Sequence, residues 1–361
     1  MNYQTIRRKT NPVMVGSVGI GGTHPLAIQS MTNTDPHDAL ATAAQILRLQ
    51  EAGCDIVRIT VPDMEAADCI PAIRAQGVTI PIVADIHFDY RVALRCAELG
   101  IDKIRINPGN IGDEDRVRQV VEACRERRIP IRIGVNSGSL EKHLLAKYGA
   151  PTAQALCDSA LYHAALLEKY DFEDIVISIK ASDVQTMVEA NRLVADACSY
   201  PLHLGVTEAG GGEMGRTKSA IGIGSMLLQG IGDTLRVSLT DDPVAEIAAA
   251  QHILDSLQIE GQSGMNIVSC PTCGRTKIDL ISLTEAFKAA VRAEGLDRTP
   301  IKVALMGCIV NGPGEAREAD VGIAGGKGEG LLFRKGEITE KVPEAELIPR
   351  LIAEIRAMDK Q

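Results

Sequence analysis

The sequence predicts an α/β protein in which a (β/α)8 TIM barrel is followed by a smaller α/β domain. Eight short runs rich in β-branched residues recur over the first 240 residues, and helix-like segments lie between the later ones. Strands that alternate with helices form right-handed βαβ units, and eight such units can close into a barrel. An open doubly wound sheet is the rival, but no GxGxxG follows the first strand and eight units are more than that fold usually needs.

The individual elements follow from local patterns. Strands are expected at 26–29, 56–60, 82–87, 103–107, 131–136, 175–180, 202–207 and 235–239. Apolar residues spaced by three and four predict helices at 38–52, 63–76, 89–99, 113–127, 152–169, 183–198 and 243–257. Most of these helices begin at an acid, Thr or Pro, which are typical helix-start residues. Residues 137–149 are expected to form a loop or an extra helix over the barrel mouth.

The pattern changes after the last barrel helix. We expect the barrel to span residues 1–257, a short polar linker to span 258–264, and a second α/β domain to span 265–361. In this second domain, strands are expected at 266–269, 301–305, near 321–324 and at 331–334, and helices at 276–294 and 344–358.

Composition excludes several classes of function. The net charge of −9 argues against binding to nucleic acid or to a membrane surface. No stretch approaches the roughly 18 to 20 apolar residues of a membrane span, and no apolar run opens the chain. Six of the nine cysteines are scattered singly, as reduced core residues would be. We therefore expect a cytoplasmic protein.

Polar residues near the ends of the barrel strands predict an anion site. The C-terminal ends of barrel strands converge on the rim where catalysis occurs. The predicted rim carries five cations, Arg58, Arg105, Arg132, Lys180 and Arg236, and two anions, Asp85 and Glu208. Like charges packed together need a partner, which a phosphate or diphosphate supplies, although any one of these arginines alone would more often form a structural ion pair.

Several rim residues have a second candidate role. Asp85, His87, Lys180 and Glu208 are side chains that can move protons, and Glu208 is favoured as an acid. The bland alternative for His87 is a hydrogen-bonded histidine near the core. The glycine-rich stretch 210–219 follows the seventh strand, where barrels often bind phosphate, but a flexible turn is an equally good interpretation.

The second domain carries a cysteine constellation. Cys270 and Cys273 can hold one metal centre from a single turn, and Cys308 returns 35 residues later. Structural zinc, an iron–sulfur cluster and a redox dithiol all remain open. A zinc site lacks a fourth Cys or His, because His252 is the last histidine, and the nearest remaining donor is the carboxylate of Glu315.

The short linker favours an assembly of two chains. The eighth barrel helix runs back to the face opposite the rim, about 20 Å or more from the strand ends. Seven linker residues reach at most roughly 25 Å and would have to pass around the helix ring. We therefore expect the thiols to meet the rim of another subunit in a head-to-tail homodimer with a two-fold axis.

Nine motifs in chain order carry a resemblance to a known family. They are ITVP, ADIHF, KIRINPGN, IRIGVNSGS, SIKAS, GVTEAGGG, KSAIGIG, CPTCGRT and MGCIVNGPGEA. In these motifs the chain closely resembles the bacterial two-domain 4-hydroxy-3-methylbut-2-enyl diphosphate synthases of the non-mevalonate isoprenoid pathway.

The resemblance implies a cofactor, partners and a reaction. It implies a [4Fe-4S] cluster held by Cys270, Cys273, Cys308 and Glu315, and a homodimer in which one subunit's cluster caps the other's barrel. The implied reaction is the reductive ring opening and dehydroxylation of 2-C-methyl-D-erythritol 2,4-cyclodiphosphate, with electrons from flavodoxin or ferredoxin. A non-redox barrel lyase or aldolase with a structural zinc site is the alternative.

The resemblance also assigns the barrel residues. Glu208 would be the acid–base group, supported by Asp85 and His87. The residues implied to bind substrate are Arg58, Arg105, Asn107, Arg132, Asn136, Lys180 and Ser238.

Overall fold

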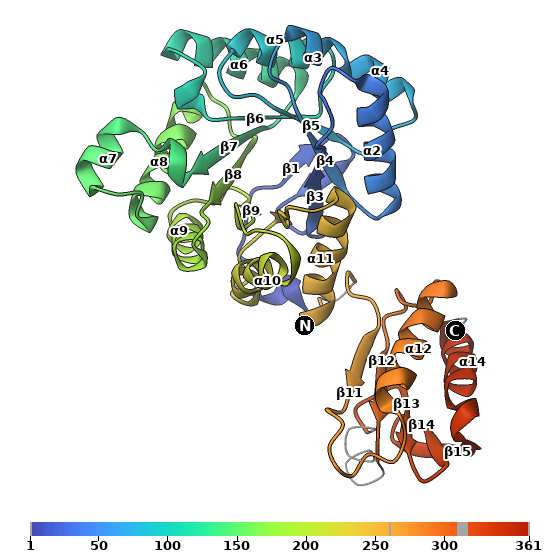
Figure 1. Ribbon diagram of the computed structural model, residues 1–361. Coiled ribbons are helices and arrows are strands. Elements are labelled where there is room, and N and C mark those ends of the chain that lie inside the picture. The colour runs from blue at the N-terminus through green and yellow to red at the C-terminus, as the bar shows by residue number, and fades with distance from the viewer. Residues whose placement is uncertain (1, 260, 309–316, 360–361) are drawn as a thin grey trace. The chain divides into compact units, whose positions relative to one another are not determined.

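The computed structural model describes residues 2–259, 261–308 and 317–359. It divides into two compact units, Asn2–Ile253 and Leu254–Gln361, each with its own sheet (Figure 1). Among the described helices, none combines the length and hydropathy that crossing a membrane requires.

The first unit is a barrel of eight parallel strands. Along the chain these are β3 (Ala27–Met31), β4 (Ile56–Thr60), β5 (Ile82–Asp85), β6 (Lys103–Ile106), β7 (Ile131–Asn136), β8 (Ile175–Lys180), β9 (His203–Leu204) and β10 (Thr234–Leu235). They are ordered β8-β7-β6-β5-β4-β3-β10-β9, and a parallel bridge between Ile177 and Leu202 brings β9 back to β8. The predicted TIM barrel and its eight strands are thereby confirmed, but the last two strands are shorter than predicted: β9 covers two residues of 202–207, and β10 shares only Leu235 with 235–239.

Helices surround the barrel. They are α2 (Ala39–Glu51), α3 (Met64–Asp68), α4 (Ile70–Ala75), α5 (Tyr90–Glu98), α6 (Glu114–Arg127), α7 (Lys142–Tyr148), α8 (Ala153–Glu168), α9 (Val184–Ala197), α10 (Gly212–Leu228) and α11 (Pro243–Ser256), with α1 (Tyr3–Ile6) before them. Six of them start at a side-chain cap, from Asp38, Asp63, Asp89, Asp113, Thr152 or Asp183. Each cap oxygen accepts a free N–H of the first turn, which explains why these starts were predictable.

Two helix predictions need correction. The segment 63–76 is two helices that meet at Cys69, because Pro71 sits at the start of α4, where a missing N–H costs nothing. Helix α10 is absent from the sequence prediction. Its first residues, from Gly212 to Ser219, belong to the glycine-rich stretch 210–219. Gly215 packs so closely against the Gly210 carbonyl that a β-carbon would come within 2.4 Å of that oxygen, so the glycine serves a helix-to-loop contact.

A hairpin that the sequence did not predict covers the N-terminal end of the barrel. Strands β1 (Val13–Val15) and β2 (Val18–Ile20) pair antiparallel. Val15 and Ile20 pack with Ala27, Ile56 and Val83, which lie near the starts of β3, β4 and β5. The apolar cluster closes this end, so the polar end of the strands is the accessible one.

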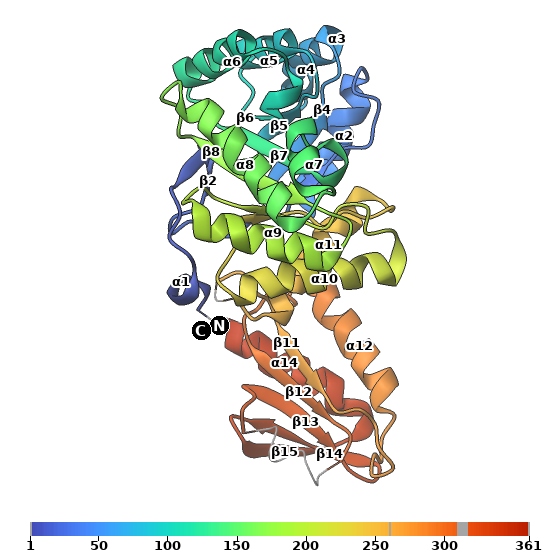
Figure 2. The same ribbon diagram turned by 90° about the vertical axis from the view of Figure 1, so that its left-hand side faces the viewer.

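The second unit is a five-stranded mixed sheet. Its strands are β11 (Asn266–Ser269), β12 (Lys302–Met306), β13 (Val321–Gly325), β14 (Glu329–Arg334) and β15 (Glu337–Pro343), in that spatial order (Figure 2). The first three are parallel and the last two pair antiparallel. Phe287 of α12 (Leu280–Ala293) and Leu351 of α14 (Leu347–Asp359) share a core with Leu305 and Ile323. Strand β15 was not predicted, because it is an exposed edge strand of mostly polar residues.

Candidate functional site

The barrel contains a pocket of about 420 Å³ at the C-terminal ends of its strands. Its lining residues are Arg58, Asp85, His87, Arg105, Arg132, Asn136, Ser137, Gly138, Ser178, Lys180, Thr207, Glu208, Arg236 and Ser238. These come from seven of the eight strands or the turns just after them, as expected of a barrel active site. The register places Arg105 beside Asp85 on one side and beside Arg132 on the other.

Asp85 balances two of the guanidinium groups. Its carboxylate lies 3.0 Å from Nη1 of Arg105 and 3.5 Å from Nε of Arg58. Burial raises the pKa of Asp85, but the positive charges of Arg58 and Arg105, with that of Arg132, lower it to a net value of about 2. The carboxylate is therefore ionised at neutral pH, which suits charge balance better than proton transfer.

His87 is a hydrogen-bond acceptor in this arrangement. Its Nε2 lies 3.3 Å from Nη1 of Arg105, and arginine can only donate. Nε2 therefore carries the lone pair, and a neutral His87 keeps its proton on Nδ1.

Two further cations have no carboxylate partner in the described part of the chain. Arg132 is 1% exposed and donates to Oε1 of Gln29 at 3.2 Å. Burial lowers the pKa of the Lys180 ammonium well below its usual range, and Arg58, Arg236 and Arg132 lower it further. The charge of this buried layer is thus poorly compensated, and a bound anion would relieve the repulsion.

Arg236 has a carboxylate partner that the sequence did not predict. It pairs with Glu246 of α11, at 3.1 Å from Nε and 3.0 Å from Nη2. Glu246 is 3% exposed. An acid within the apolar run Pro243–Ala250 was the available signal, because a glutamate is seldom fully buried unless it is paired.

Glu208 lies on the turn between β9 and α10 and lines the pocket. It is exposed and has a backbone φ of 52°, in the left-handed region that few residues other than glycine adopt. Such a conformation at a pocket wall is typical of a functional turn.

Two predictions about the rim do not match the pocket geometry. Asn107 is buried and does not line the pocket; its Oδ1 accepts the Gly109 N–H at 3.1 Å and starts the 3-10 turn Pro108–Asn110. The glycine-rich stretch also does not line it, because Gly212 and the residues after it form α10. The 3-10 turn Ser137–Ser139, by contrast, brings Ser137 and Gly138 to the pocket.

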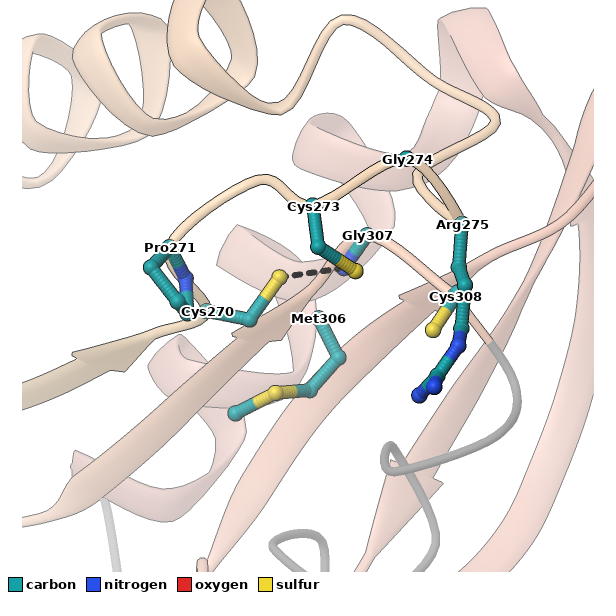
Figure 3. Close-up of a pocket in the computed structure, with 8 residues that line it drawn as sticks. All are labelled: Cys270, Pro271, Cys273, Gly274, Arg275, Met306, Gly307 and Cys308. Carbon is teal, nitrogen blue, oxygen red and sulfur yellow. Dashed lines mark hydrogen bonds between the residues drawn. The ribbon is translucent and has the colours of Figure 1, made fainter.

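The second unit contains a thiol pocket of about 520 Å³. Cys270, Pro271, Cys273, Gly274, Arg275, Met306, Gly307 and Cys308 line it (Figure 3). Cys270 follows β11 and Cys308 follows β12, and these strands pair in parallel, so their ends are adjacent. Thr272, with a φ of 48°, makes the tight turn that returns Cys273 to the pocket.

The donor set of this pocket fits a thiolate-bound cluster. Three cysteine thiols line one pocket, and Sγ of Cys270 accepts the Gly307 N–H at 3.3 Å, a hydrogen bond typical of cluster sulfur ligands. Over 2–259, 261–308 and 317–359, no three Cys, His, Asp or Glu side chains converge on one point as ligands of a single ion would. Glu315, the predicted fourth ligand, lies outside the described residues.

Comparison with family models shows which protein family this chain belongs to. The model described as the GcpE TIM-barrel domain matches residues 10–251, and that of the GcpE protein C-terminal domain matches residues 266–357. The chain belongs to the GcpE family. The resemblance seen in the sequence motifs is thereby confirmed.

Curated relatives agree with this membership. The chain is 58% identical over 346 residues to a 4-hydroxy-3-methylbut-2-en-1-yl diphosphate synthase (flavodoxin) of Clostridium perfringens strain 13 / Type A, covering 96% of this chain and 98% of the relative. It is 55% identical over 355 residues to the protein of the same name from Bacillus cereus strain G9842, covering 98% and 95%.

Solved structures share the barrel fold with this GcpE chain. A type I 3-dehydroquinate dehydratase from Clostridium difficile has a TM-score of 0.51 at 13% identity, covering 69% of this chain and 98% of its own. A 7,8-dihydropteroate synthase from Vibrio fischeri ES114 has a TM-score of 0.50 at 12% identity, covering 69% and 99%. At such identities the likeness concerns the fold alone.

Proposed function

We propose that this chain catalyses the reductive ring opening and dehydroxylation of 2-C-methyl-D-erythritol 2,4-cyclodiphosphate to 4-hydroxy-3-methylbut-2-enyl diphosphate. The observation that carries the proposal is identity of 58% over nearly the whole chain to a relative that bears the synthase's name. Flavodoxin, which that name includes, is the proposed electron donor, with ferredoxin as the other candidate. A non-redox lyase or aldolase has no support from the family relationship.

The barrel pocket is the proposed substrate site. A cyclic diphosphate carries the negative charge that the buried cations need, and guanidinium groups bind phosphate oxygens through paired N–H donors. Asn136 and Ser238 add uncharged polar groups to the wall. The proposed binding residues are Arg58, Arg105, Arg132, Asn136, Lys180 and Ser238, and Asn107 is proposed to support them through the turn that its side chain starts.

Glu208 is the proposed acid. Loss of a hydroxyl group as water requires a proton at the leaving oxygen. Glu208 lines the pocket, and among the described residues its carboxylate forms no ion pair, so it is available to a bound ligand. Asp85, by contrast, is held ionised by its arginines and is proposed to fix Arg58 and Arg105, while His87 orients Arg105.

Cys270, Cys273 and Cys308 are proposed to hold a [4Fe-4S] cluster, with Glu315 as the fourth ligand. Such a cluster supplies low-potential electrons one at a time, which a reductive dehydroxylation needs. Pro271, Gly274 and Arg275 of the turn itself line the pocket around the thiols.

A homodimer is also proposed, in which the thiol pocket of one chain serves the barrel of its partner. Support comes from the short connection, because α11 ends at Ser256 and β11 begins at Asn266. Complementation tests this assembly. Co-expressed E208Q and C273S chains should recover about a quarter of the wild-type activity, because about half of the dimers are mixed and each of these has one intact site of its two, whereas a site built within one chain would leave the mixture inactive.

Anaerobic turnover tests the proposed reaction. The protein should purify brown with about four irons per chain and should convert the cyclodiphosphate when reduced flavodoxin is supplied. A colourless zinc protein, or an iron-loaded protein that leaves the cyclodiphosphate unchanged, would contradict it. Fractionation of the source cells should place the enzyme in the cytoplasm, the compartment we propose.

A further inference from the structure

Glu246 holds one wall of the barrel pocket together, although it does not line the pocket. It lies on α11, and its side chain is 3% exposed on the face toward β10 and β3. Its carboxylate contacts three separate parts of the chain: the Arg236 guanidinium, the backbone after Ser238 and the hydroxyl of Ser30.

Each carboxylate oxygen of Glu246 receives two donors. Oε1 accepts from Nη2 of Arg236 at 3.0 Å and from the Leu239 N–H at 3.1 Å. Oε2 accepts from Nε of Arg236 at 3.1 Å and from Oγ of Ser30 at 2.8 Å. An ionised carboxylate has about four lone-pair positions, so its accepting capacity is used.

This geometry fixes the part of Arg236 that a ligand can reach. Nε and Nη2 are directed at Glu246, and Nη1 points elsewhere, 3.5 Å from Sδ of Met31. The bond to Leu239 meanwhile holds the segment that carries Ser238 against α11. One carboxylate therefore fixes the positions of both the Arg236 guanidinium and Ser238 in the pocket wall.

We propose that Glu246 is a positioning residue for diphosphate binding, which acts by holding Arg236 and the Ser238 segment in their binding geometry. The inference rests on the proposed substrate, since it concerns the same pocket. A negative charge behind the pocket repels a diphosphate, so Glu246 favours binding only through geometry. If Glu246 acts through geometry, removing its charge should weaken diphosphate binding. If it acts only through its charge, the same substitution should strengthen diphosphate binding.

Replacing Glu246 with Gln tests the proposal. Gln keeps the shape of the side chain, but an amide NH2 group replaces one of the two carboxylate oxygens. That NH2 group then faces donors of Arg236, where an acceptor is required. We expect KM for the cyclodiphosphate, and Kd for inorganic diphosphate measured by calorimetry on the anaerobic holoenzyme, to rise about tenfold or more. We expect kcat to change less than about threefold and the iron content to stay the same. Equal or tighter diphosphate binding by E246Q would overturn the proposal.

Two controls separate position from charge. E246D keeps the charge but is one methylene too short to reach all four donors, so it should also weaken diphosphate binding. D241N removes a nearby exposed charge, paired with Arg216 at 3.1 Å, and should leave Kd unchanged or slightly lower. If E246Q does not fold, E246D and S30A carry the test, and wild-type affinity in both would reject the proposal.

A double variant shows whether Glu246 acts through Arg236. If it does, E246Q should weaken diphosphate binding much less in an R236K background than in the wild type. If the losses of diphosphate affinity in E246Q and R236K simply added up in the double variant, Glu246 would not act through Arg236. Wild-type protein that binds neither inorganic diphosphate nor the cyclodiphosphate would instead refute the proposed substrate site, so the two failures are distinguishable.

Discussion

The barrel pocket and the thiol pocket are built in opposite ways. In the barrel pocket the charged side chains are mostly buried and bonded to one another, as Asp85 is to Arg58 and Arg105. In the thiol pocket Cys273 is exposed, and Cys270 and Cys308 are only partly buried. The strand register sets the first site through the fold itself. The second presents three thiols on turns, which would gain rigidity from a bound metal centre.

The largest effect should come from breaking the thiol pocket alone. C273S should lose the cluster and with it all detectable turnover, because serine is a poor ligand for iron–sulfur iron. Since the barrel pocket is built independently, diphosphate binding should stay within about twofold of wild type. Iron analysis and calorimetry on the same anaerobic sample check both halves.

A matched control uses a cysteine from the barrel unit. C69S changes a partly buried thiol of the barrel unit, which donates to the His37 carbonyl at 3.5 Å, and should keep both iron and turnover. Loss of diphosphate affinity in C273S would mean that the two pockets are not independent.

Next in size is the loss of the proposed acid in the barrel pocket. E208Q should lower kcat by about 10² to 10⁴ while the iron content stays at the wild-type level. E213Q, which changes an exposed acid in the first turn of α10, is the control and should be nearly normal. Near-normal kcat in E208Q would remove this residue from the mechanism.

The sequence predicted the residues that line the barrel pocket better than the residues that hold them in place. Strand ends are marked by single polar residues in otherwise apolar runs, so Arg105, Lys180 and their neighbours were identifiable without coordinates. Asn107 shows the limit of this reasoning, because a residue at the end of a strand can equally turn back to cap its own loop. Glu246 shows another limit, since its importance depends on donors that lie from 7 to 216 positions away.

Elements without a periodic signal were also missed. The hairpin β1–β2 has strands of three residues, too short for a pattern to emerge. Helix α10 contains four glycines among its 17 residues, so its composition resembles a loop, and tertiary packing overrides that preference. The cysteine pattern, in contrast, was explicit in the sequence, because thiols that could share one centre stand out by residue type and spacing, while the kind of centre stayed open.

The buried charges of the barrel pocket should make its stability depend on pH. The pKa of Asp85 is about 2 in the folded protein, below the usual value near 3.9, so its ionisation stabilises the fold above about pH 4. That contribution, about 2 to 3 kcal/mol, is lost as the pH falls from about 4 through 2. The gap in unfolding free energy between wild type and D85N should therefore be widest near pH 6 and should narrow in acid.

Urea unfolding at several pH values measures that gap. D68N is the control, because it breaks an exposed pair with Arg95 and should cost less than about 1 kcal/mol throughout. A gap for D85N that stays constant from pH 6 to pH 3 would show that Asp85 does not balance the buried guanidinium groups.

The smallest effect concerns the cost of keeping an unbalanced cation inside the barrel. Lys180 is 7% exposed and lies among arginines, whereas Lys277, beside the thiol pocket, is exposed. K180M should therefore raise the free energy of unfolding by about 1 kcal/mol, because it removes like-charge repulsion and a desolvated ammonium, while it weakens diphosphate binding. K277M should change stability by less than about 0.5 kcal/mol. If K180M were less stable than wild type, the ammonium would have to be compensated within the folded barrel, and the contrast between a charged, prebuilt pocket and an exposed set of ligands would lose its energetic basis.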